Sequence, residues 1–397
     1  MSGFDVIVLG GGAAGCFAAV QAGKRGKKVL LIDGGKRIGG KIPISGGGRC
    51  NFTNRNAKPD RFASANPRFA HSALAAFSAA DTEAWIAAAG IPYHEKKLGQ
   101  LFCDRSALDV VGLLEKDLRE AGVAVKLNAK VAGLDRAGAG FKAFGPGWEE
   151  GAPKVVVALG GSSYPLLGAT DLALRFAKQL GLAVQDTAPA LDGFVWNEED
   201  AQRFEGLQGL ALDVRMSCGG KSFDEALLFT HRGLSGPVAL QASLYWRPGE
   251  PVKIDWRPGV DLEASLLQTK TQSGYLNFEN WLGLAQGAGL PRRLAERWSD
   301  LYSLGTGPVF NLGEKALRKA AERLKQWTFV PAGTVGWHKA EVMRGGVDTG
   351  ELNQKTMEAK KVPGLYFVGE AVDVTGQLGG YNFQWAFASG YVCGQSV

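Results

Sequence analysis

The apolar and polar positions at the start of the chain predict a strand, a tight turn, a helix and a second strand. The apolar run 4–9 leads into the glycine-rich segment 10–15, and small apolar residues follow at helical spacing. A second apolar run, 28–32, ends at Asp33. This succession is typical of a dinucleotide-binding βαβ unit, because its glycines allow the turn between the first strand and the helix.

Three glycines and one carboxylate in this unit have separate roles. Gly10 allows the turn, Gly12 lets the backbone approach a pyrophosphate, and Gly15 lets helix and strand pack closely. Asp33 follows the last glycine by 33 − 15 = 18 residues, near the offset of about 20 at which a carboxylate binds a ribose hydroxyl. This context disfavours an ordinary glycine-rich turn. FAD and NAD both remain candidates, whereas the acid disfavours the 2′-phosphate of NADP.

The pattern changes twice between this unit and Pro189. Helical spacing dominates 69–121, and a strand over 123–131 has an expected hairpin partner at 141–144. The apolar run 154–159 is typical of a buried parallel strand, and it ends in glycine. A helix is expected over 170–180.

After Pro189, short alternating segments over 190–260 predict antiparallel strands in an inserted unit. Residues 262–330 turn helical again, and we expect Trp281, Trp298 and Trp327 to pack these helices together. Four helices are expected there, at 262–267, 276–284, 292–302 and 314–325. The end of the chain returns to a strand at 365–368, a glycine-rich turn and a helix over 383–393.

Residues 34–56 form a long glycine-rich loop, a feature that is usually functional inside a compact domain. Its glycines let the backbone approach a ligand, and Lys41 and Arg49 offer charge to phosphates or to a flavin.

Composition narrows the class of protein. The net charge of +6, from 45 basic and 39 acidic residues, is a mild excess without a run of five or six basic residues, so we expect no nucleic-acid partner. The five cysteines are widely spaced without a CxxC pair, which predicts reduced thiols and no metal site. No apolar run reaches the roughly 18 residues that span a bilayer, and the first strand begins near Met1, which leaves no room for a signal peptide. We therefore expect a cytoplasmic protein with no membrane partner.

Several motifs together resemble one family over essentially the whole chain. They are GGGAAG at 10–15, SGGGRCNFTN at 45–54, ALGGSSYP at 158–165, FTHRGLSGP at 229–237 and GEAVDVTGQLGGYNFQWAFASGY at 369–391. The chain resembles the BaiN/RdsA family of NAD(P)/FAD-dependent oxidoreductases. The resemblance implies an α/β fold with a Rossmann-like FAD-binding domain of the glutathione-reductase type, an inserted small β-barrel and a helical subdomain. The implied boundaries are 1–188 with 335–397 for the FAD domain, 189–260 for the β insert and 261–334 for the helical insert.

The resemblance also implies which residues bind FAD. The expected residues are Gly10, Gly12, Ala13, Ala14 and Gly15 at the pyrophosphate; Asp33 and Gly34 at the ribose; Val131 at the adenine through its backbone; Lys41, Ser45, Gly46, Arg49, Cys50 and Asn51 on the flavin side; Ala158 and Gly160 after the buried strand; Gly369, Glu370 and Asp373 at ribityl or pyrophosphate groups; and Gly380, Tyr381 and Asn382 at the pyrimidine end of the flavin.

The expected chemistry is hydride transfer between a small-molecule substrate and non-covalent FAD, since a flavin carries out that step itself. His231 is the candidate proton donor or acceptor, and the alternative is that Ser235 caps a helix while His231 orders the turn before it. Cys50 is either a flavin-facing thiol or a small residue in a tight loop.

Without a second GxGxxG motif, reoxidation by oxygen, by a partner or by transiently bound NAD(P) stays open. A flavin-binding regulatory protein without turnover is the alternative function, and the sequence does not indicate an oligomeric state.

Overall fold

The computed structural model describes residues 3–272, 275–302 and 307–397, and the chain divides into two compact units. The first unit comprises 1–189 and 341–397, and the second comprises 190–340. The outer boundaries expected from the sequence are 188/189 and 334/335, whereas the expected division at 260/261 does not separate two units, because 190–340 form one.

A five-stranded parallel sheet forms the centre of the first unit. Its strands, in spatial order, are β21 (Leu365–Phe367), β11 (Lys154–Val157), β1 (Val6–Leu9), β2 (Val29–Ile32) and β7 (Ala124–Lys126). All four residues of β1 and of β2 are buried. Burial on both faces explains why these strands read as unbroken apolar runs rather than as alternating ones. The first and last parts of the sequence thus meet in one sheet.

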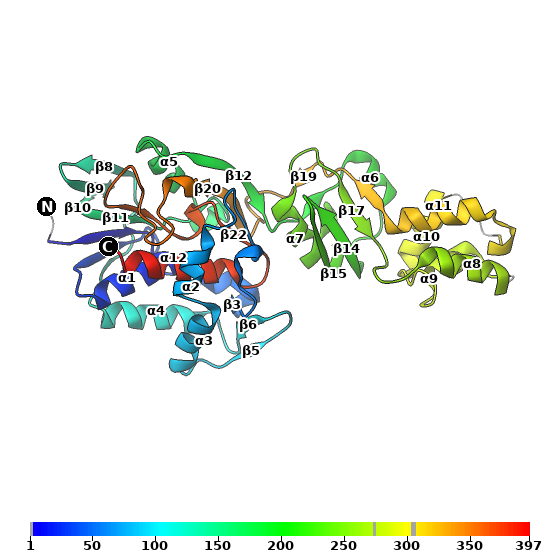
Figure 1. Cartoon of the computed structure of the whole chain (residues 1–397), viewed down its shortest axis with the longest axis horizontal. Helices are drawn as coiled ribbons and strands as arrows, with labels where there is room; N and C mark the ends of the chain where they lie inside the picture. The colour runs from blue at the N-terminus through cyan, green and yellow to red at the C-terminus, as the bar shows by residue number, and fades with distance from the viewer. Residues whose placement is uncertain (1–2, 273–274, 303–306) are drawn as a thin grey trace. The chain divides into compact units, whose positions relative to one another are not determined.

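The two ends of the chain also meet as helices. α1 (Ala13–Lys24) and α12 (Tyr381–Gly394) lie side by side in the first unit (Figure 1). A Cβ on Gly390 would lie 2.5 Å from the Ala14 oxygen, and one on Gly394 would lie 2.5 Å from the Ala18 oxygen. The glycines of α12 are therefore required because the two backbones approach each other closely.

Smaller sheets and helices complete the first unit. The strands are β3 (Asn51–Asn54), β6 (Gln100–Cys103) and β5 (Tyr93–Glu95) in one sheet; β10 (Trp148–Ala152), β9 (Gly140–Gly145) and β8 (Gly133–Ala137) in another; and the pairs β12 (Val184–Ala190) with β20 (Val342–Val347) and β22 (Thr375–Gly376) with β4 (Phe62–Ala63). The helices are α2 (Ala70–Ala76), α3 (Ala79–Ala88), α4 (Leu108–Glu120) and α5 (Leu172–Gln179).

Three sequence-based expectations need correction here. The stretch 69–121 contains β5 and β6 between its helices, because strands of three and four residues give too little periodicity to detect. The hairpin partner of β9 is β8, not 123–131, since β7 instead joins the parallel sheet. The helix expected over 170–180 begins after Asp171, its N-cap residue.

The second unit contains a seven-stranded antiparallel sheet. Its strands, in spatial order, are β18 (Trp327–Phe329), β17 (Val252–Asp255), β14 (Ala211–Cys218), β15 (Lys221–Phe229), β16 (Gly233–Ser235), β13 (Phe194–Val195) and β19 (Gly333–Thr334). The strands β18 and β19 come after the helices in sequence, so the stretch 261–334 is not purely helical as expected. Both strands have three residues or fewer, which is too short for a sequence pattern.

Among the described residues of this unit, six helices accompany the sheet. They are α6 (Glu198–Arg203), α7 (Pro237–Tyr245), α8 (Leu262–Gln272), α9 (Phe278–Gly283), α10 (Arg292–Tyr302) and α11 (Glu314–Lys325). Helices α8 to α11 gather at one end of the second unit (Figure 1). Trp281 and Trp298 are 1% and 2% exposed in this unit's core, as expected. Trp327 instead lies on β18, where its ring packs against Trp298 and Trp256 and so connects sheet to helices.

None of the helices in the described parts of the chain is long and apolar enough to cross a membrane.

Candidate active site

The turn after β1 combines two crowded glycines with one open glycine. Gly10 has a φ of +104°, and a Cβ there would lie 2.3 Å from the Ala158 oxygen. A Cβ on Gly15 would lie 1.9 Å from the Gly10 oxygen. In contrast, a Cβ on Gly12 would meet no atom within 4 Å. Gly10 and Gly15 therefore allow strand, turn and helix to pack, while Gly12 faces open space.

Gly12 is the N-cap residue of α1, and no side chain caps this helix end. The first turn of a helix leaves backbone N–H groups without intrahelical partners and carries partial positive charge. An uncapped helix N-terminus beside a glycine turn fits a pyrophosphate, because its backbone N–H groups can bind the phosphate oxygens and no side chain occupies the space in front of them. Ala13 and Ala14 form the first helical residues there.

Asp33 lies at the end of β2 and closes against the same turn. Its Oδ2 accepts a hydrogen bond from the Gly11 N–H at 2.6 Å, and its Oδ1 accepts one from the Gly35 N–H at 2.6 Å. These bonds hold the carboxylate beside the glycine turn. A carboxylate has about four acceptor positions, so it can still accept a ribose hydroxyl. The neighbouring Ala129 N–H donates to the Asp33 carbonyl, which brings the buried Val131 segment alongside.

An ion pair lies at the carboxyl ends of the central strands. Lys41 Nζ contacts Glu370 Oε2, and the Met343 N–H donates to Glu370 Oε1 at 2.8 Å. A Cβ on Gly160, after β11, would lie 3.6 Å from Glu370 Oε2 and 3.9 Å from Lys41 Nζ. The structure thus brings together three segments that the sequence had singled out separately. In parallel sheets this edge is where ligands bind.

The loop 45–54 has an unusual backbone. Gly46, Gly47 and Gly48 have φ values of +56°, +66° and +86°, and Cys50 has +47°. Ser45 Oγ donates to the Ile42 oxygen at 2.6 Å, and the Cys50 N–H donates to the Ser45 oxygen at 3.1 Å. These bonds hold a compact loop that exposes Arg49 and leads into Asn51, the first residue of β3.

Cys50 itself is fully buried, and burial raises the pKa of its thiol well above the ordinary range. A reactive cysteine needs the opposite, a lowered pKa and access to solvent. These features favour the second alternative from the sequence, a small residue in a tight loop. All five cysteines are free and buried.

The C-terminal glycine turn is held by its own side chains. The Asn382 amide accepts from the Gly376 N–H at 2.8 Å and donates to the Gly376 oxygen at 2.9 Å. The buried Tyr381 ring packs edge-on against Phe62. Gly380, at φ +92°, begins α12 without a side-chain cap. What this turn offers to a ligand is therefore chiefly the backbone of the helix N-terminus.

Neighbours that the sequence analysis missed hold this turn in place. The Ala65 N–H donates to Asp373 Oδ2 at 2.8 Å. The buried Gln384 Oε1 accepts from Thr53 Oγ1 at 2.6 Å and from Thr82 Oγ1 at 2.7 Å. Gly369, which follows β21, donates its N–H to Ser389 Oγ at 3.0 Å. These partners lie 20 to 331 residues apart in sequence, so no local pattern could have indicated them.

His231 belongs to the second unit. Thr230, not His231, orders the turn: its Oγ1 accepts from the Arg232 and Gly233 N–H groups at 3.3 and 3.1 Å. The imidazole is exposed. The expected Ser235 cap is wrong, because Ser235 ends β16 and Gly236 is the N-cap residue of α7.

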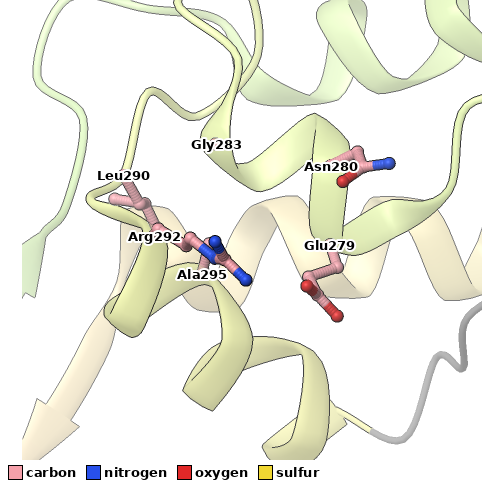
Figure 2. Close-up of a pocket in the computed structure, with 6 residues that line it drawn as sticks. All are labelled: Glu279, Asn280, Gly283, Leu290, Arg292 and Ala295. Atoms are coloured by element: carbon pink, nitrogen blue, oxygen red, sulfur yellow. The ribbon is translucent and has the colours of Figure 1, made fainter.

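A cavity of about 370 Å³ in the second unit is separate from these residues. Figure 2 shows Glu279 and Asn280 on α9 and Arg292 on α10 around it. Arg292 Nε donates to Glu296 at 2.7 Å. None of the residues expected from the sequence to form the site lines this cavity.

The Rossmann-type sheet and the glycine-lined turns at its carboxyl edge define a dinucleotide-binding protein. The chain belongs to the family described as HI0933-like protein Rossmann domain, whose model matches residues 4–396. This confirms the resemblance found in the motifs.

Three relatives match nearly the whole chain. "Ribosomal RNA dihydrouridine synthase" of Escherichia coli (strain K12) is 44% identical over 100% of this chain and 98% of its own length. The protein of the same name from Haemophilus influenzae is 41% identical over 98% of each chain. "3-dehydro-bile acid delta(4,6)-reductase" of Clostridium scindens is 29% identical over 98% of each chain.

Proposed function

We propose that this enzyme reduces uridine in ribosomal RNA to dihydrouridine. The observation that carries the proposal is the end-to-end match, at 44% identity, to a relative with that named activity. The match includes both units of the chain, so it extends beyond the cofactor-binding part that many oxidoreductases share.

The relatives' two names describe the same type of bond. Dihydrouridine forms when the C5–C6 double bond of uracil, which is conjugated to the C4 carbonyl, is reduced. A 3-dehydro bile acid with unsaturation at positions 4 and 6 likewise has carbon–carbon double bonds conjugated to a carbonyl. Such reductions add a hydride to the carbon β to the carbonyl and a proton to the α carbon. Bound FAD, once reduced, supplies the hydride.

In this proposal the residues of the chain bind and orient the cofactor. Gly12 and the N-terminus of α1 bind the pyrophosphate, Asp33 accepts a ribose hydroxyl, and the Val131 backbone meets the adenine. Lys41 and Glu370 fix the carboxyl edge of the sheet. The uncapped N-terminus of α12 at Gly380 stabilises negative charge at the pyrimidine end of the flavin. The other residues that the sequence predicts for the site, such as those of the loop 45–51, line the flavin side of the same cofactor site.

His231 is the proposed proton donor to the α carbon, because its side chain is exposed and imidazole is a common general acid in enzymes. NAD(P)H, bound transiently, is the proposed source of the electrons. A small conjugated ketone is the second candidate substrate, and the bile-acid reductase among the relatives supports it. The alternative of a flavin-binding protein without turnover is the outcome if neither substrate reacts.

The test uses the purified protein with FAD, under anaerobic conditions, and ribosomal RNA from cells that lack dihydrouridine. NADPH or NADH should bleach the flavin absorbance, and adding the RNA should restore it. Digestion to nucleosides and mass spectrometry should then detect dihydrouridine. Restoration of the absorbance by a small conjugated enone but not by RNA would overturn the RNA substrate. Reoxidation by neither would favour the non-catalytic alternative.

A further inference from the structure

The positive charge of the chain is unevenly distributed. The second unit carries seventeen basic and seventeen acidic residues, so the entire net charge of +6 belongs to the first unit. Within that unit, residues 34–77 contain eight basic residues and one acidic residue, Asp60. The local excess in this segment is thus larger than the net charge of the whole chain. The expectation of no nucleic-acid partner rested on contiguous basic runs. That criterion overlooks this excess, because only Lys36 and Arg37 are adjacent and the other charges are spaced three to eight residues apart.

Some of these cations are already paired. Lys41 contacts Glu370, and Arg55 contacts Glu83 and Glu95 at 2.6 and 2.7 Å. Arg61 has Asp60 at 3.9 Å, but both side chains are largely exposed, and such pairs contribute little. Lys58 and Arg68 are exposed and have no ion-pair partner among the residues that the structure describes. Lys58 and Arg68 are therefore available to bind an anion, and Arg61 can do so by exchanging its weak contact with Asp60.

The segment 58–68 holds these cations outward by anchoring their neighbours inward. Phe62 and Phe69, which follow Arg61 and Arg68 directly, are 6% and 2% exposed. The Asn66 N–H donates to Ser64 Oγ, and the Arg68 N–H donates to Asn66 Oδ1, both at 3.1 Å. An ordered backbone lowers the entropy that is lost when a ligand binds.

This segment is also part of the active-site edge. β4, which follows Arg61, pairs with β22, and the Gln377 N–H donates to the Arg61 oxygen at 3.0 Å. Ala65 donates to Asp373. The segment that carries the exposed cations is thus hydrogen-bonded directly to the turn 373–377. This turn belongs to the proposed cofactor site.

We propose that the segment 58–68 is a docking surface for the RNA backbone, on which Lys58, Arg61 and Arg68 bind phosphates that flank the target base. This inference rests on the proposed function. Phosphate contacts from lysine and arginine supply most of the sequence-independent affinity of RNA-binding proteins and position the nucleic acid. The base itself is then delivered to the adjacent carboxyl edge of the sheet.

The test compares two triple variants that each lose one lysine and two arginines. The docking variant is Lys58→Gln/Arg61→Gln/Arg68→Gln. The control variant is Lys28→Gln/Arg119→Gln/Arg136→Gln, whose exposed side chains lie outside 34–77. Binding of protein-free ribosomal RNA is measured from 50 to 200 mM salt, together with flavin content and thermal unfolding of each protein.

We expect the docking variant to bind this RNA about 10- to 100-fold more weakly at 0.1 M salt, with a salt slope lower by about 2, since single-stranded nucleic acid gives a slope of about 0.7 per phosphate contact. The RNA affinity of the control variant should stay within about threefold of that of the unchanged protein, because its three lost charges act on the RNA only over a long distance, where salt screens them. Flavin content should not change in either variant.

Equal losses in both variants, or none in the docking variant, would overturn the docking surface. The docking surface would also be overturned if the docking variant lost binding to anionic phospholipid vesicles but still bound RNA as tightly as the unchanged protein. The proposed function fails separately: it fails if the unchanged protein binds RNA but forms no dihydrouridine, whereas the docking surface fails if dihydrouridine forms and the docking variant binds as tightly as the control.

Discussion

The second unit contains seven of the ten tryptophans and has no net charge, whereas the first unit carries the whole net charge and the glycine turns. In the second unit, large rings such as Trp196, Trp256 and Trp298 fill the core. In the first unit, the site is built largely from backbone that glycines allow to pack closely, as at Gly10 and Gly15. The core of the second unit thus depends on large side chains. The binding surface of the first unit depends on glycines, because a residue without a side chain lets backbone segments pack closely.

Trp256→Ala should have the largest effect. Trp256 is 1% exposed. Its ring stacks on that of Phe229 with the centroids 6.0 Å apart, and the centroid of the Trp327 ring lies 5.5 Å away. Its removal leaves a large cavity, which costs about 3–5 kcal/mol of unfolding free energy. Urea unfolding followed by circular dichroism measures the loss. The matched control, Tyr275→Ala, removes a ring that is 92% exposed and should cost less than about 0.5 kcal/mol. Loss of FAD from the Trp256 variant under native conditions would show that the two units depend on each other.

Gly12→Val should abolish FAD retention without unfolding the first unit. A side chain there meets open space in the protein, so it should block the pyrophosphate and leave the backbone unchanged. We expect FAD affinity to fall by at least about 100-fold, or roughly 3 kcal/mol. The absorbance spectrum of the gel-filtered protein measures bound flavin. Gly112→Val, which also adds a side chain into open space, should keep its flavin. Stoichiometric flavin in the Gly12 variant would refute the assigned role.

His231→Ala should slow dihydrouridine formation by about 100-fold and leave FAD bound, since a positioned proton donor contributes about that factor. His338→Ala, another exposed histidine of the same unit, is the control. An unchanged rate would leave the proton to another group.

Cys50→Ala should have the smallest effect. Because burial raises the pKa of this thiol, no thiolate is present near neutral pH. We expect turnover within about twofold of the unchanged enzyme and a stability loss of about 1 kcal/mol. Single-turnover kinetics check the first and urea unfolding the second. A large fall in turnover with flavin retained would restore Cys50 as a catalytic residue.

The sequence alone determined the parts of this protein whose physics is local. A fully buried parallel strand needs a continuous apolar run, and the turn after β1 needs glycine where a Cβ would meet the backbone, so both are visible in order along the chain. The helices α10 and α11 were predicted correctly for the same reason, since each is amphipathic over at least eleven residues.

Tertiary structure decided what depends on residues far apart in sequence. The pairing of β4 with β22, the contact of Lys41 with Glu370 and the bonds from Gln384 to Thr53 and Thr82 join segments about 300 residues apart. The short strands β18 and β19 exist because neighbouring strands supply their partners, and no pattern of two or three residues can encode that. The basic surface over 58–68 likewise depends on which residues of the segment are buried. Packing determines that, and the order of charges along the sequence does not.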